Sequence, residues 1–302
     1  MKRTHFFWAL SALCSTSIMA MPARAQAPQP ATGSTSSTTT APETFGQGVL
    51  FPVSLFDTAL NERVNKEGEV NYAQLKGDEN LEKFVRAVAA ADVTKFPVFK
   101  AAPVEEANPN ATKKEQAPQD DRSWELAFWI NAYNAHFIKA IADAYPLSNV
   151  TTVKDFDKAR TRVVAGQNLS FEQMRAKIAA FDPRALFALI DGTKSGPAMA
   201  SQAYRWTGLS TLLDANISGF MNHPNNVQLT RIQNKVAVSE FLASVDEAFK
   251  PKGARRKWDG IRWLLTTYTQ QRADRNFYAA NEYEVLFTPR TYDLNNWTHS
   301  DD

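Results

Sequence analysis

One apolar stretch constrains the fold of this chain more than any other part of its sequence. Residues 125–141 read "ELAFWINAYNAHFIKAI", and nearly every position is apolar. The stretch contains neither proline nor glycine, which favours one long helix from about Arg122 to Tyr145, stopped by Pro146. Because that helix is apolar on almost every side, we expect it to lie buried at the centre of the core.

Two asparagines interrupt the apolar surface of this predicted helix. Asn131 and Asn134 are three residues apart, so a helix places them on one face. A buried amide without a hydrogen-bond partner costs about 1–3 kcal/mol, so both side chains should be paired. They could tie nearby loops to the helix, line a ligand cleft, or lie on an exposed face. The sequence leaves these alternatives open and favours the first.

The N-terminus has the layout of a secretory signal peptide. Lys2 and Arg3 precede an apolar run, which ends at the small residues Ala23 and Ala25. Cleavage after Ala25 would remove three basic residues and no acidic one, which changes the formal charge from +2 to about −1. It would also remove the one cysteine, leaving a mature chain without disulfides. We therefore expect an exported protein, periplasmic or extracellular.

Composition divides the remainder into a spacer and one domain. Residues 26–48 are rich in Pro, Ser, Thr, Ala and Gln, which predicts a disordered spacer. Residues 49–302 form the single predicted domain, and the polar, proline-containing stretch 103–121 reads as a surface insertion within it. The small net charge gives no indication of nucleic-acid binding. A second long apolar run is absent from the sequence, so we expect no transmembrane segment in the mature chain.

Helical and alternating patterns predict an α+β fold, rich in helices, with a small mixed or antiparallel sheet. Apolar spacing predicts further helices at 51–65, 78–92, 207–224, 239–249 and 258–273. Short strands are predicted at Val70–Tyr72, in the strand–turn–helix pattern 161–178, at Ala185–Ile190, on both sides of a bend at Asn234, and at 282–289.

Side chains able to carry chemistry are few. Asp191, Lys194 and Ser195 could form a local acid, base and nucleophile, although neighbours on one loop rarely converge in this way. The mature histidines show no metal-ligand spacing, so we expect neither a metal nor another cofactor. His136 reads as a satisfied histidine and not as a base. Tyr204, Trp206 and Trp258 lie near predicted loops and could stack on a sugar ring or on a partner. The basic run 250–257 is typical of a solvated loop, and less often such a run docks an acidic surface or lipid headgroups.

Several elements together resemble one protein family. They are "VNYAQLK", "AFWINAYNAHFIKAI", "LSFEQM", "FALIDGTKSGP", "VQLTRIQNKVAVSEFLASVDEAF" and "EVLFTPRTYDLNN", in that order. The chain resembles the bacterial and plant family catalogued as domain of unknown function 547 over about residues 54–297. The most specific element, W-x-N-A-Y-N, makes five side chains candidates for a binding or structural network: Trp129, Asn131, Tyr133, Asn134 and His136.

The chain also departs from the pattern that this resemblance implies. In the family, the segment at 185–190 carries a histidine and an asparagine, and two cysteines follow it. These positions hold Leu186, Ile190, Asp191 and Gly196 here, and Arg175 stands at the position of a glutamate. A thiol nucleophile assembled from such residues is therefore absent from this chain.

Three functions are consistent with these features. The favoured one is a non-catalytic binding or interaction module of the cell envelope, whose ligand or protein partner the sequence does not identify. A hydrolase or transferase that uses Asp191 and Ser195, or an unidentified base, is an alternative. A purely structural partner protein is the third.

Export generates a direct prediction. Mass spectrometry of the mature protein from its native host should find an N-terminus at Gln26 and no attached lipid, because the cleavage site follows Ala25. A retained Met1, or the added mass of a diacylglyceryl group, would contradict the assignment to an exported compartment.

Overall fold

The computed structural model describes residues 51–98, 122–159 and 161–298, which lie in one compact unit. The predicted signal peptide, the spacer at 26–48 and the insertion at 103–121 lie outside the described residues. The helices are α1 (Val53–Leu60), α2 (Tyr72–Leu75), α3 (Glu79–Ala90), α4 (Ser123–Ala144), α5 (Phe171–Phe181), α6 (Leu209–Met221), α7 (Phe241–Val245), α8 (Asp259–Tyr268) and α9 (Arg272–Ala280). The strands are β1 (Arg162–Val164), β2 (Gln167–Leu169), β3 (Val227–Thr230), β4 (Lys235–Ser239) and β5 (Glu284–Thr288).

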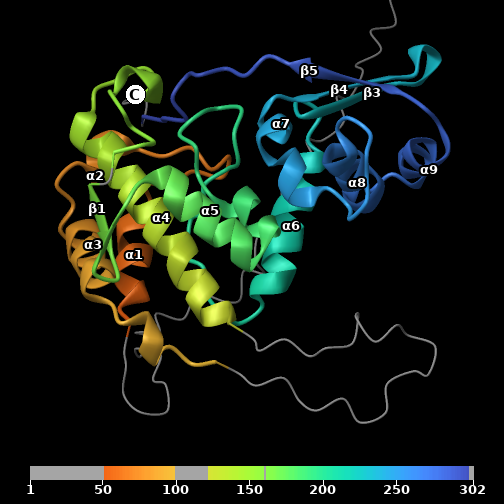
Figure 1. The fold of residues 1–302 in the computed structure, drawn as a ribbon. Coiled ribbons are helices and arrows are strands. Elements are labelled where there is room, and N and C mark those ends of the chain that lie inside the picture. The colour runs from red at the N-terminus through yellow and green to blue at the C-terminus, as the bar shows by residue number, and fades with distance from the viewer. Residues whose placement is uncertain (1–50, 99–121, 160, 299–302) are drawn as a thin grey trace, which may run out of the picture. The chain divides into compact units, whose positions relative to one another are not determined.

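Helix α4 is the centre of the first hydrophobic core, as predicted. It has 22 residues, of which 17 are buried. Helices α2, α3 and α5 pack around it (Figure 1). Burial on nearly all sides explains why its sequence lacks the polar face of a surface helix. Among the described residues, no helix is both long and apolar enough to cross a membrane.

A second hydrophobic core forms among α6–α9 and the larger sheet. That sheet has the order β3-β4-β5, with β3 antiparallel and β5 parallel to the central strand. Val236 and Val238 of β4 are fully buried against the helices. The two strands β1 and β2 form a separate antiparallel hairpin. The prediction of a helix-rich α+β fold with a small mixed sheet is therefore confirmed.

The strand predicted at Ala185–Ile190 is wrong. Residues Pro183–Ala188 form a 3₁₀ helix, which Asp182 caps by accepting a hydrogen bond from the backbone N–H of Arg184. Pro183 at the first position presets the helical φ angle. A continuous apolar run cannot distinguish a buried strand from a buried helical segment. The run is apolar because it lies between the two cores, where Leu186 packs against both.

Two further predicted elements differ from the structure. The helix expected at 258–273 is two helices, because Asn222 pairs with the backbone between them: its Nδ2 donates to Tyr268 O at 2.8 Å, and its Oδ1 accepts from Gln270 N at 2.8 Å. The strand expected at Val70–Tyr72 is reduced to isolated bridges at Val70, and Tyr72 already begins α2.

The segment after β5, which we name the C-terminal strap (residues 289–298), returns to the first core beside α2 (Figure 1). Asn295 is its main attachment. Its carbonyl accepts from Val70 N at 2.8 Å, its backbone N–H donates to Gly192 O at 3.0 Å, and its side chain accepts from the buried Tyr72 hydroxyl at 2.7 Å. The strap thereby joins the start of the domain to the loop after the 3₁₀ helix.

Candidate functional site

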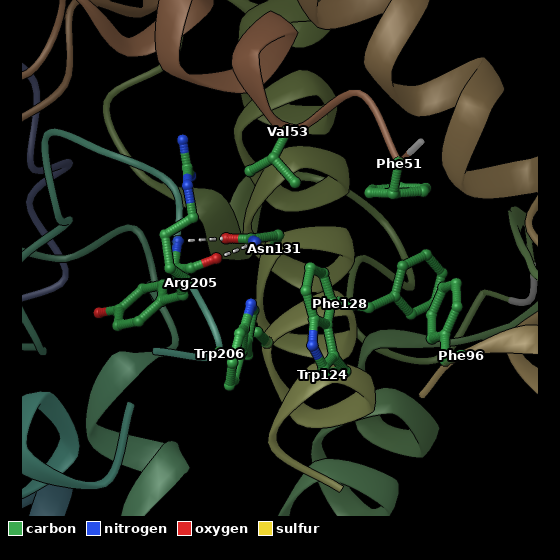
Figure 2. A pocket seen from close by; sticks show the side chains of 10 residues that line it. Phe51, Val53, Phe96, Trp124, Phe128, Asn131, Arg205 and Trp206 are labelled. Atoms are coloured by element: carbon green, nitrogen blue, oxygen red, sulfur yellow. Dashed lines mark hydrogen bonds between the residues drawn. The ribbon is translucent and has the colours of Figure 1, made fainter. Parts of the chain in front are cut away.

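Both asparagines of α4 are hydrogen-bonded to the backbone of the segment 188–204. Asn131 accepts from Tyr204 N and donates to Tyr204 O, each at 2.8 Å, and Figure 2 shows these paired bonds. Asn134 donates to Ala188 O at 2.9 Å and accepts from Ile190 N at 3.0 Å. Each amide thus supplies one donor and one acceptor to the backbone of an irregular stretch.

A narrow apolar pocket lies beside Asn131. Phe51, Phe96, Trp124, Phe128 and Trp206 line it with their rings (Figure 2). The open space is about 10 Å³, no more than one water molecule requires. The pocket in this conformation therefore has no room for a larger ligand next to the asparagine.

Tyr133 is fully buried, and its hydroxyl accepts a 2.8 Å hydrogen bond from Arg175 Nη1. Arg175 also pairs with Asp157 at 3.1 Å. Burial raises the pKa of Tyr133 to about 12, against the opposing effect of the nearby guanidinium. The phenol is therefore neutral at physiological pH and holds Arg175 in place.

Trp129 and His136 are also enclosed by their neighbours. The Trp129 indole Nε1 donates to Glu125 Oε1 at 3.3 Å, and Lys177 Nζ lies 4.6 Å from the centre of its ring. His136 Nε2 is 3.3 Å from Val163 O, so that nitrogen must carry the proton. Burial lowers the pKa of His136 to about 4. The imidazole is thus neutral and faces a carbonyl, with no reacting group beside it.

Asp191, Lys194 and Ser195 do not converge. The carboxylate of Asp191 forms an ion pair with Arg290 and accepts two 2.9 Å hydrogen bonds from Thr193. Ser195 Oγ instead donates to Thr291 O at 3.0 Å. Lys194 Nζ extends toward Glu69 at 3.9 Å. Burial raises the pKa of Asp191, while the Arg290 charge opposes that rise.

The positions at which the resemblance places two cysteines abut each other in space. A Cβ built on Gly196 would overlap the carboxylate of Asp191, so any side chain at 196 would need that space. Here the carboxylate fills it and is neutralised by Arg290 from the C-terminal strap. Sequence reasoning missed Arg290, because its partner lies 99 residues away along the chain.

A second, wider cleft lies between α8 and α9 and was not predicted. Its volume is about 310 Å³, and its walls include Arg256, Asp259, Arg262, Trp263 and Tyr283. The basic run 250–257 forms part of its rim through Pro251 and Arg256. The sequence predicted a solvated loop here. The structure adds that the run borders a cleft lined by the aromatic residues Trp263 and Tyr283.

The aromatic residues proposed for stacking lie elsewhere. Tyr204 is buried, and its hydroxyl accepts from Asn216 Nδ2 at 3.0 Å, so the expectation that it stacks on a ligand is wrong. Trp206 stacks on Trp124 with ring centres 5.5 Å apart. Trp258 packs edge-on against Phe287 at 4.8 Å. Within the described ranges, no group of three His, Cys, Asp or Glu residues is placed to hold a metal.

Comparison with known proteins gives one match. Residues 119–221 match the model of the family described as "Protein of unknown function, DUF547". The match covers part of the chain and supports its resemblance to this family. The matched segment runs through α4, the β1–β2 hairpin, α5, the Asp191 loop and α6. It is narrower than the resemblance at 54–297, since it excludes the C-terminal strap and the α8/α9 cleft. The search found no matching curated protein and no matching solved structure.

The two amides generate a stability prediction. Replacing Asn134 with alanine leaves Ala188 O and Ile190 N unpaired in the core, and we expect a loss of about 2–5 kcal/mol in the free energy of unfolding. Asn131→Ala should have a similar effect through Tyr204. Because the two amides lie three residues apart on one helix face and bond to the same segment, the double variant should lose less than the sum of the two losses, as measured by urea unfolding.

The exposed Asn276 of α9 provides the matched control, since its alanine variant should stay within about 0.5 kcal/mol of the wild type. Wild-type stability in both core variants would show that the four hydrogen bonds contribute little.

His136 generates a pH prediction. The unfolded chain binds a proton at this residue below its ordinary pKa of about 6.5, whereas the folded chain does so only near pH 4. Stability is therefore lost as pH falls through that interval. Relative to His136→Gln, which keeps a donor for Val163 O, the wild type should lose roughly 2–3 kcal/mol between pH 7 and 4.5. If the wild type and His136→Gln lost the same stability in urea unfolding at every pH, the lowered pKa of His136 would be contradicted.

Proposed function

We propose that this protein is an exported binding module of the cell envelope, which holds a polar ligand without converting it. The arrangement of the Asp191 loop is the observation that carries the proposal. The carboxylate is held by Arg290, and the Ser195 hydroxyl donates to a backbone carbonyl. A serine nucleophile needs a neighbouring base that removes its proton. The Ser195 hydroxyl instead donates to the carbonyl of Thr291, which is not a base.

The polar side chains of α4 support the same proposal. Asn131, Asn134 and Tyr133 each have protein partners, and His136 is held neutral by burial. General acid–base catalysis requires a titrating group near neutral pH within reach of a substrate. The buried network favours a structural role, while the α8/α9 cleft offers an open polar surface.

The hydrolase or transferase alternative uses Asp191 and Ser195, or an unidentified base, and its first form requires these two residues to act together. Their side chains face different partners, and Thr193 lies between them, with its Oγ1 2.9 Å from Asp191 Oδ1 and 3.5 Å from Ser195 Oγ. The geometry therefore favours binding over this reaction.

The test uses the mature chain, beginning at Gln26, and purified envelope fractions from the native host. We expect saturable co-sedimentation with one fraction and no change in the mass of the recovered ligand after prolonged incubation. Ser195→Ala should bind and behave like the wild type. A time-dependent mass change that Ser195→Ala abolishes would establish the enzyme alternative. Binding to none of the envelope fractions would contradict the proposed function.

A further inference from the structure

We infer that the α8/α9 cleft is a binding site for a neutral saccharide, an inference that deepens the proposed function by naming a ligand class. The cleft lies between the two helices and the loops before α8 and after α9. Its volume of about 310 Å³ is at the small end of the range that ligand sites occupy, about 300–1,000 Å³. Such a space suits one compact ring unit better than a long chain.

Trp263 provides an aromatic wall. The residue is 36% exposed, so part of its side chain is accessible from the cleft. Phe249 stacks on its ring at 5.8 Å, and Tyr268 meets it edge-on at 5.9 Å. These contacts fix the orientation of the indole, so a ligand would meet a rigid apolar surface with little loss of side-chain freedom.

Tyr283 brings an unpaired polar group to the same cleft. The residue is 6% exposed, and within the part of the chain that the structure describes its hydroxyl has no hydrogen-bond partner. Arg262 lies 4.4 Å from the Tyr283 ring centre and donates to Tyr283 O at 2.8 Å, yet its buried Nε is likewise unpaired there. Buried polar groups without partners cost about 1–3 kcal/mol each and are rare in folded proteins. Both atoms are shielded from solvent, so a ligand hydroxyl would pair with them only after the cleft walls shift to admit it.

The charges around the cleft favour a neutral ligand. Arg256 Nη1 pairs with Glu282 at 2.6 Å, and the Arg256 backbone N–H donates to Asp259 at 2.7 Å. Among the lining residues, Arg256 and Arg262 balance Asp259 and Glu282, and the other basic residues of the run 250–257 lie outside the lining. A multiply charged ligand would find no excess of opposite charge on the lining itself, whereas a polyhydroxylated ring can donate and accept at every position.

Aromatic and polar features together define the class. A sugar ring presents an apolar C–H face to an aromatic side chain and hydroxyls around its edge. Trp263 matches the first feature, and Tyr283 and Arg262 match the second. A purely aromatic ligand would stack on Trp263 but would leave the Tyr283 hydroxyl and Arg262 Nε without hydrogen bonds. A simple ion would make no stacking contact with Trp263.

The test measures binding by the full mature chain to three single-ring probes: N-acetylglucosamine, methyl β-glucoside and methyl α-glucoside. Saturation-transfer NMR and calorimetry report binding, with citrate and spermidine as charged comparators. We expect at least one neutral probe to bind and neither charged probe to do so. Tyr283→Phe removes only the hydroxyl and should weaken binding at least tenfold, and Trp263→Ala should abolish it.

The matched control is Tyr292→Phe, which removes an exposed hydroxyl from the C-terminal strap and should bind like the wild type. The melting temperature separates binding from folding: Tyr283→Phe should equal or exceed the wild type, because it removes an unpaired buried group. Unchanged affinity in Tyr283→Phe and Trp263→Ala, binding of a charged probe alone, or failure of all three saccharides would overturn the inference.

The two proposals fail separately. Envelope fractions that retain Tyr283→Phe as well as the wild type would place the ligand elsewhere and leave the proposed function standing. If saccharide binding depends on Tyr283 but no envelope fraction retains the protein, the cleft inference stands and the proposed envelope function fails.

Discussion

Four hydrogen bonds between two side-chain amides and the backbone of residues 188–204 join the central helix to the irregular part of this fold. That segment contains the end of a 3₁₀ helix and a loop, and within the described residues its strand-like pairing is limited to the isolated bridge between Thr193 and Leu294. A buried backbone group must find a partner somewhere. Asn131 and Asn134 provide such partners from a rigid helix. The order of the loop therefore depends on two polar residues at positions where a core helix would otherwise carry leucine.

The same loop holds the C-terminal strap in place. Lys194 N donates to Asp293 O at 3.0 Å, and Gly192 O accepts from Asn295 N at the same distance. The ion pair between Asp191 and Arg290 closes the contact at the other end of the strap. A buried carboxylate is stable only where a charge and hydrogen bonds replace its water. The residues that sequence reasoning selected as candidate catalytic groups thus connect two distant parts of the chain.

The sequence predicted the features that local pattern can encode. The unbroken apolar run identified α4 as central, and the helical spacing at 78–92 identified α3, which Asp78 caps by accepting from Leu81 N. Partners distant in sequence could not be read. The residues bonded to Asn131 and Asn134 lie between 54 and 73 positions away. The run at 185–190 was misread because contact with two cores removes the alternation that separates strand from helix. The α8/α9 cleft depends on a helix break set by Asn222, which no local signal marks.

Asn222 also shows how the family segment and the cleft are related. The matched region ends at Met221, the last residue of α6, and Asn222 follows at once. Its side chain holds the junction between α8 and α9, so the second core is attached to the matched segment at a defined point. The α4 amides and the cleft walls have no residue in common. Substitutions in the cleft should therefore leave the bonds that order the Asp191 loop undisturbed, and a fold of this kind can carry a site without its central core taking part.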